Sequence, residues 1–175
     1  KNVCLFLKKL QDPDHFYNVP LTATITVSTM NKPTGQVVLA TDTKNNVYVT
    51  SSESGKIQAE LLVIDAVLYK KNASGTWQQQ DGVDNQALLQ FRQKALKQAS
   101  MQTKTTTYTL LGKENCGSLT CYQYQVSTPN LGNAKTYIFF DTNDYLLRKV
   151  VNQTQNTMTE TTFAYTPLKI TPPIQ

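Results

Sequence analysis

The sequence predicts an α+β fold that is mainly β, with about eleven antiparallel strands and one central helix. Apolar side chains alternate with threonine and serine over residues 21–28, which is the pattern of a strand with one buried face. Similar segments follow along most of the chain. Over residues 84–99 the pattern changes to a helical period, with Leu88, Phe91 and Leu96 on one face. The two periodicities indicate a sheet with one helix available to cover it.

The elements follow one another without a linker, so we expect a single domain over residues 1–175. A short helix and a loop occupy residues 1–17, and Pro13 between two aspartates ends the helical pattern. The expected strands, each bounded by turn-forming residues, are Leu21–Met30, Gln36–Thr41, Val47–Ser51, Lys56–Ile64, Ala66–Lys71, Thr76–Gln80, Thr105–Lys113, Leu119–Thr128, Lys135–Asp141, Tyr145–Asn152 and Met158–Tyr165.

Turn and cap residues support these boundaries. Asn31–Gly35 has the composition of a turn between the first two strands. Asp84 is a suitable N-cap for the central helix, which interrupts the run of strands. The prolines of residues 166–175 predict a rigid, extended tail.

A sheet with one apolar face needs a cover, and the chain offers little helix to supply it. Either the sheet closes on itself around a filled core, or it curves around the helix and leaves an apolar hollow. Nearly continuous apolar runs at residues 61–64 and 137–140 indicate that parts of the sheet are covered on both faces. The periodicity alone leaves both arrangements open.

The composition excludes some classes of partner. Charged residues make up 17% of the chain, and the net charge of +5 is spread out rather than gathered in a basic stripe. No nucleic-acid-binding motif accompanies it, so we expect no nucleic acid partner. Mild attraction to an anionic membrane or cell-wall surface is the expected use of this charge. The chain opens Lys1-Asn2-Val3, which suggests a trimmed or mature form from which a leader or a lipid-anchoring segment has been removed.

The spacing of two cysteines favours a disulfide. Cys116 and Cys121 flank four residues at a predicted hairpin turn. A metal site is the rival interpretation, but it normally needs a second ligand pair, and the chain has one histidine and no other cysteine pair. A disulfide implies an oxidising compartment. Cys4 is then left over, and we expect it to pack as a small apolar side chain.

Catalytic equipment is sparse in this sequence. His15 is the only histidine and lies in a polar loop between expected elements. The serines lie in turns without a nucleophile motif, and the glycines do not cluster into a phosphate-binding loop. Asp141 and Asp144 bracket a turn between strands, which is ordinary turn chemistry. We therefore expect no catalytic residue, no metal and no cofactor, and a protein that is not an enzyme.

Several segments together resemble the LolA-like lipoprotein-sorting and carrier superfamily, including its LppX/LprG group of lipid-binding lipoproteins. Leu21–Val27 resembles the opening strand of these proteins, and Gly112–Val126, with its cysteine pair and Cys121-Tyr122-Gln123-Tyr124, is similar to one of their hairpins. Tyr137–Asp141 followed by Tyr145–Val150 resembles their two-strand signature, and Phe163-Ala164-Tyr165 before the tail is similar to their closing segment. The resemblance spans nearly the whole chain.

The resemblance implies a curved antiparallel half-barrel whose concave side is closed by helices and holds a hydrophobic ligand. The implied function is extracytoplasmic, non-catalytic binding or carriage of a lipid or acylated molecule, with a lipid anchor in the full-length precursor. The candidate cavity residues are Ile25, Val27, Leu39, Val49, Leu61 and Val63 on the strands and Leu88, Phe91 and Leu96 on the lid helix. The alternative is a cell-surface interaction module of the same fold, with a self-filled core, that recognises a protein or a wall polymer.

Overall fold

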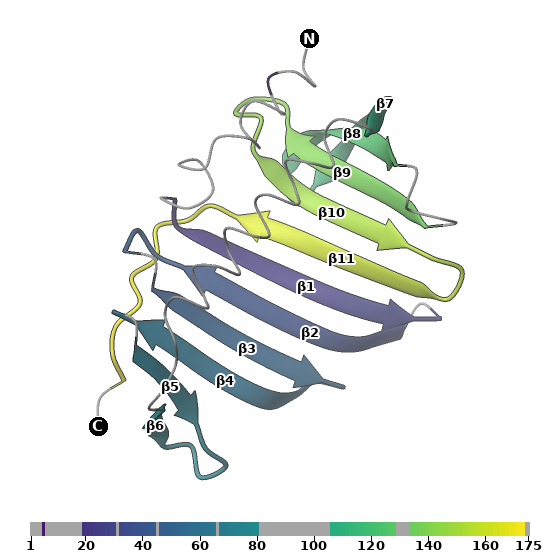
Figure 1. Cartoon of the computed structure of the whole chain (residues 1–175). Coiled ribbons are helices and arrows are strands. Elements are labelled where there is room, and N and C mark those ends of the chain that lie inside the picture. The colour runs from purple at the N-terminus through teal and green to yellow at the C-terminus, as the bar shows by residue number, and fades with distance from the viewer. Residues whose placement is uncertain are drawn as a thin grey trace.

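The computed structural model describes residues 5, 19–30, 32–44, 46–65, 67–80, 106–128 and 134–173. These residues form one open, 11-stranded antiparallel sheet, as predicted (Figure 1). In chain order the strands are β1 (Leu21–Thr29), β2 (Lys32–Thr41), β3 (Val47–Glu53), β4 (Lys56–Ile64), β5 (Val67–Lys71), β6 (Trp77–Gln80), β7 (Thr107–Cys116), β8 (Leu119–Ser127), β9 (Lys135–Asp141), β10 (Leu147–Gln153) and β11 (Thr157–Ala164).

The first strand lies at the centre of the sheet, because β1 pairs with both β2 and the last strand, β11. The order across the sheet is β6-β5-β4-β3-β2-β1-β11-β10-β9-β8-β7. The chain therefore runs outward from β1 to one edge, resumes at the opposite edge with β7, and returns inward to β11. The predicted central helix Asp84–Ala99 falls in the connection between the two edges and lies outside the described residues. The predicted helix and loop of residues 1–17 also lie outside them, apart from Leu5, which is helical.

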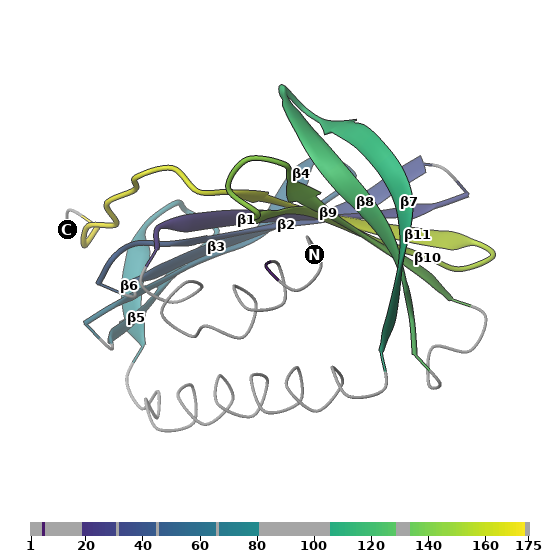
Figure 2. The same ribbon diagram turned by 90° about the horizontal axis from the view of Figure 1, so that it is seen from above.

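The sheet is bent into a trough, with the C-terminal tail (residues 165–173) on its outer side (Figure 2). Ile170 of this tail packs against Leu62 and Ile64 of β4, so these two side chains belong to the outer, convex face. Because successive side chains of a strand alternate, Leu61 and Val63 belong to the inner, concave face. The curvature and the strand content confirm the predicted half-barrel.

Buried apolar side chains gather in two clusters on opposite faces of the sheet. The aromatic cluster lies on the concave face of β8–β10, and the tail cluster lies on the convex face of β4. The members of the aromatic cluster are Tyr124, Ile138, Phe140 and Leu147, and those of the tail cluster are Leu62, Ile64 and Ile170. The sheet is thus covered on both faces, as the apolar runs at residues 61–64 and 137–140 indicated. The cover lies over β8–β10 on the concave face and over β4 on the convex face.

The predicted turn Asn31–Gly35 is wrong in extent, because β2 already begins at Lys32. Pro33 lies within the ladder although it cannot donate a hydrogen bond, which strands tolerate next to a bulge. The bulge is at Thr34: the register shifts beside Val27, and Oγ1 of Thr34 donates to the carbonyl oxygen of Val27 at 3.2 Å. The extra residue lets the ladder continue past the proline.

Other predicted strand ends also differ from the structure by one to three residues, and two of them are informative. The tenth strand was expected to begin at Tyr145, but β10 begins at Leu147. Tyr145 has a φ of 59°, a left-handed conformation outside the β region, so the turn after β9 extends through it. In the seventh strand the ladder continues beyond Lys113 to Cys116.

Candidate functional site

An apolar strip crosses the concave face over β1–β4. Ala23 pairs with Leu39, Leu39 pairs with Val49, and Val49 pairs with Leu61. Residues that face each other in antiparallel strands project to the same side with Cβ atoms about 5 Å apart. Leu39, Val49 and Leu61 are half-buried, so the strip retains apolar surface that can contact another molecule.

A second row continues this surface toward the aromatic cluster. Ile25 pairs with Val37 of β2 on one side and with Thr161 of β11 on the other. The same row then passes through Val150 to Ile138, a member of the aromatic cluster. These two rows together extend the apolar part of the concave face from β4 to β9. Ser51 of β3, which pairs with Val37, and Thr161 of β11 are the polar residues of the second row.

The structure brings the six strand candidates together on the concave face. They occupy alternate positions of β1 to β4: Ile25, Val27, Leu39, Val49, Leu61 and Val63. The register pairs Leu39, Val49 and Leu61 with one another, whereas Val27 pairs with Gly35 and Thr159. The three candidates on the lid helix, Leu88, Phe91 and Leu96, lie outside the described residues. That any of these side chains contacts a ligand stays a prediction.

The aromatic cluster fills its own part of the concave face. Phe140 is fully buried, and its ring is stacked on that of Tyr124 with 5.1 Å between centroids. Tyr122 and Tyr145 flank it in tilted arrangements at 5.6 and 6.3 Å, which aromatic pairs favour. The contrast with half-buried Ile25 shows that the face is packed over β8–β10 and less covered over β1–β4.

A polar cluster lies beside the aromatic cluster. Nη2 of Arg148 contacts Oδ2 of Asp141 at 3.2 Å and Oδ2 of Asp144 at 2.6 Å. The guanidinium group also stands 5.2 Å from the centre of the Tyr165 ring. Burial raises the pKa of Tyr165 to about 12, although the positive charge of Arg148 acts to lower it. The two aspartates thus pair with an arginine in addition to their predicted role in the turn, and Tyr165 stays protonated at neutral pH.

On the convex face, Asp42 holds the C-terminal tail. Its Oδ1 accepts hydrogen bonds from the backbone N–H groups of Lys44 and Asn46 at 2.9 and 3.0 Å. Its Oδ2 accepts from Nδ2 of Asn46 at 3.0 Å and from the N–H of Ile170 at 3.2 Å. Asn46 in turn accepts from the N–H of Asp65 at 3.1 Å. Two turns and the tail are therefore tied to one carboxylate.

The hydrogen bonds decide the protonation state of Asp42. Burial alone would raise its pKa, but Asn46 and the backbone donors outweigh burial and lower the pKa below the ordinary value of 3.8. The carboxylate is therefore ionised near neutral pH, and charge-assisted hydrogen bonds of this kind are stronger than neutral ones.

A second polar group on the convex face joins β3, β4 and β5. Glu60 accepts a hydrogen bond from the Tyr48 hydroxyl at 2.9 Å and pairs with Nζ of Lys71 at 2.8 Å. The hydrogen bond from Lys71 lowers the pKa of Glu60. Burial raises the pKa of Tyr48 to about 12, and the neighbouring carboxylate of Glu60 adds to this rise. Lys71 also lies 5.6 Å from the centre of the Trp77 ring. These contacts connect β3, β4, β5 and β6 through their side chains, and we assign them a structural role.

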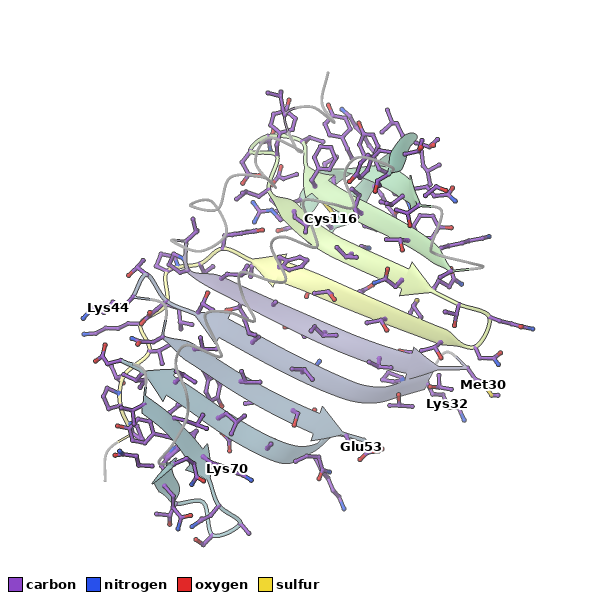
Figure 3. All side chains as sticks on the ribbon, viewed as in Figure 1. Met30, Lys32, Lys44, Glu53, Lys70 and Cys116 are labelled. Carbon is purple, nitrogen blue, oxygen red and sulfur yellow. A yellow bond between two sulfur atoms is a disulfide. The ribbon has the colours of Figure 1, made fainter. Side chains whose placement is uncertain are left out.

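The predicted disulfide between Cys116 and Cys121 is confirmed, with 6.0 Å between the Cα atoms. Both side chains project from the convex side of the β7–β8 hairpin, and Figure 3 shows Cys116 among the strands of that end of the sheet. Gly117 in the two-residue turn has a φ of 64°, which glycine adopts without strain. Cys4 and His15 lie outside the described residues.

Sequence reasoning missed the Asp42 and Arg148 clusters. The contact between Asp42 and Ile170 leaves no local signal, because its partners come from opposite ends of the chain. Arg148 follows Asp144 by four positions, a spacing that could have suggested an ion pair.

Within the described ranges, no group of three metal-ligating side chains occurs. In the same part of the chain, no helix is long and apolar enough to cross a membrane.

Comparison with solved structures identifies proteins of the same fold. LprF of Mycobacterium bovis is 14% identical, covers 98% of both chains and has a TM-score of 0.59. The lipoprotein LppX of Mycobacterium tuberculosis is 7% identical, with 98% of this chain and 100% of that chain covered and a TM-score of 0.59. MucB in the Pseudomonas aeruginosa MucA/MucB complex is 11% identical over 97% of this chain and 59% of that chain, with a TM-score of 0.56.

At the level of sequence, no protein-family model matches this chain, and no curated protein does. Identities of 14% and below carry information on the fold alone. The chain has the fold of LprF and of the lipoprotein LppX, and this agrees, at the level of the fold, with the resemblance that the sequence motifs indicated.

Proposed function

We propose that this protein binds an acyl chain of a lipid or an acylated molecule on the concave face of its sheet and does not transform it. The observation that carries the proposal is the apolar strip from Ala23 to Leu61 on a curved face, in which Leu39, Val49 and Leu61 are half-buried. Burying a methylene group contributes about 0.8 kcal/mol, so a strip that spans four strands suffices for useful affinity.

The predicted lid completes this proposal. Leu88, Phe91 and Leu96 share one face of the predicted helix, and the segment that contains them connects β6 and β7 at opposite edges of the sheet. A chain that joins those edges has to pass the sheet, and we propose that the apolar face of the helix covers the ligand against the strip. This arrangement gives each ligand methylene an apolar neighbour on two sides.

The proposed location is extracytoplasmic. The disulfide between Cys116 and Cys121 is typical of oxidising compartments, and LppX, which has the same fold, is a lipoprotein by name. A lipid anchor on the precursor and attraction of the net charge of +5 to an anionic membrane or cell-wall surface belong to the same proposal.

Adjacent valines of β2 provide a matched test. Val37 pairs with Ile25 and projects to the concave face, whereas Val38 projects to the convex face, and both are half-buried. We expect wild-type protein to take up a fluorescent fatty acid such as 11-(dansylamino)undecanoic acid and to carry co-purified lipid in native mass spectrometry. Val37→Asn should weaken the uptake at least about fivefold, whereas Val38→Asn should leave it within about twofold.

Two outcomes would contradict the proposal: the absence of both uptake and bound lipid in wild-type protein, or an equal loss in both variants. The rival function, recognition of a protein, has one observation in its favour, since MucB shares the fold and is found with MucA. A protein partner that binds wild-type protein and Val37→Asn equally, without lipid uptake, would support that rival.

A further inference from the structure

Two buried polar atoms of the polar cluster have no hydrogen-bond partner. Among the residues that the structure describes, Nε of Arg148 and the hydroxyl of Tyr165 are the buried side-chain atoms without one. They belong to neighbouring groups, since the guanidinium lies 5.2 Å from the centre of the Tyr165 ring. Native structures pair nearly all such groups, and each exception calls for an explanation.

Arg148 cannot turn to satisfy its own Nε. Its Nη2 is held by Asp141 and Asp144, and each carboxylate is fixed in turn, because Asp141 accepts from the N–H of Asn143 at 2.9 Å and Asp144 from that of Leu146 at 2.8 Å. The guanidinium is therefore preorganised, and its buried Nε–H is left without a partner.

Both unpartnered atoms are donors. Nε–H can only donate, and Tyr165 keeps its proton because burial raises its pKa to about 12. The two carboxylates outnumber the single guanidinium, so the cluster as a whole does not attract an anion. A neutral acceptor oxygen fits both the hydrogen-bonding need and the charge.

The cluster also lies where the polar end of an acyl ligand would be expected. Arg148 directly follows Leu147, a member of the aromatic cluster, and occupies a bulge of β10. Phe163, two residues before Tyr165, packs against the same cluster and pairs with Ala23 of the apolar strip. The donors thus adjoin the concave face.

We propose that Nε–H of Arg148 and the hydroxyl of Tyr165 bind the ester carbonyl oxygen of an acylglycerol whose chain lies on the concave face. This inference rests on the proposed function. It adds the class of ligand: neutral acyl esters bind better than ethers of the same length, which lack the carbonyl oxygen.

A matched pair of lipids tests it. We compare 1-monolauroylglycerol with 1-O-dodecylglycerol by isothermal titration calorimetry on the full chain. Wild-type protein should bind the ester about five- to tenfold more tightly, the value of a hydrogen bond whose donors are otherwise unpaired. Tyr165→Phe should remove most of this preference and leave the affinity for the ether unchanged. Arg148→Lys, which keeps the positive charge beside both aspartates but has no Nε–H, should do the same.

Stability without ligand distinguishes binding from a structural role. Because the Tyr165 hydroxyl has no partner, Tyr165→Phe should melt at the wild-type temperature or above it. Tyr137→Phe, on the convex face, is the control and should keep the preference for the ester.

An equal affinity of wild-type protein for ester and ether overturns this inference and leaves the proposed function intact. A preference that survives both substitutions, or a lower melting temperature of Tyr165→Phe with unchanged binding, also overturns it. If neither lipid binds to wild-type protein, the proposed function fails as well.

Discussion

The backbone N–H of Ile170 donates a hydrogen bond of 3.2 Å to Oδ2 of Asp42, although 128 positions separate the two residues. The same carboxylate holds the β2–β3 turn through Asn46 and Lys44. Asp42 is 3% exposed, so these hydrogen bonds form away from water, where unpaired donors are costly. The attachment of the tail to the convex face thus depends on one side chain.

Removing this carboxylate should destabilise the protein strongly. In Asp42→Ala, the buried N–H groups of Asn46 and Ile170 lose their acceptor, and we expect the free energy of unfolding to fall by about 3 kcal/mol. Urea denaturation followed by circular dichroism measures the change. Asp65→Asn is the control: Asp65 takes part in this network through its backbone N–H, so its stability should stay within about 0.5 kcal/mol of wild type.

The same carboxylate predicts an acid-dependent loss of stability. The pKa of Asp42 is lower in the folded protein than its ordinary 3.8, so the folded state binds this proton more weakly than the unfolded chain. Its contribution is complete above the unfolded pKa and is lost as the pH falls through the folded pKa. Between about pH 5 and about pH 2 the urea midpoint of wild-type protein should fall more steeply than that of Asp42→Asn. Parallel curves would contradict this prediction.

The tail should stabilise the sheet through one side chain in particular. Ile170 is 9% exposed and packs on Leu62 and Ile64, whereas Leu168 is 39% exposed. Ile170→Ala should lower the free energy of unfolding by about 2 kcal/mol or more, because it removes buried methyl groups. Leu168→Ala should cost less than about 0.5 kcal/mol. Equal effects of the two substitutions would show that the packing of Ile170 contributes little.

The disulfide predicts both a thiol count and a stability change. Of the three cysteines in the chain, only Cys4 should react with iodoacetamide when the protein is unfolded in urea without reductant, and all three after reduction. Reducing the bond should lower the free energy of unfolding by about 2 kcal/mol, the entropic contribution of a short loop. Cys4→Ser should leave the effect of reductant unchanged. Three reactive thiols in unreduced protein would refute the pairing.

Local patterns in the sequence were sufficient to predict the strands and the face that they share. The period of two places Ile25 and Val27 on the same side of β1 whatever strand lies next to it. The cysteine pair likewise predicts its own disulfide, because the hairpin that joins Cys116 and Cys121 is local.

The features that escaped prediction depend on distant contacts or on irregular backbone. Ile170, which donates a hydrogen bond to Asp42, lies in the C-terminal tail, and no residue near Asp42 in the sequence indicates this contact. The bulges at Thr34 and Arg148 shift the register of their ladders, and they follow from pairing with the neighbouring strand rather than from propensity. The same bulge in β10 occurs at the arginine whose Nε is left without a partner.

The central position of β1 has a consequence for how the chain folds. Each arm of the sheet, β1 to β6 and β7 to β11, is built from hairpins between consecutive strands, which form quickly because their loops are short. The two arms meet in the ladder between β1 and β11, where Thr22 pairs with Ala164, and closing so long a loop is slow. We therefore expect the β1–β11 ladder to form last, after synthesis of nearly the whole chain. Until then β1 exposes an unpaired edge, which makes this step the one most exposed to aggregation.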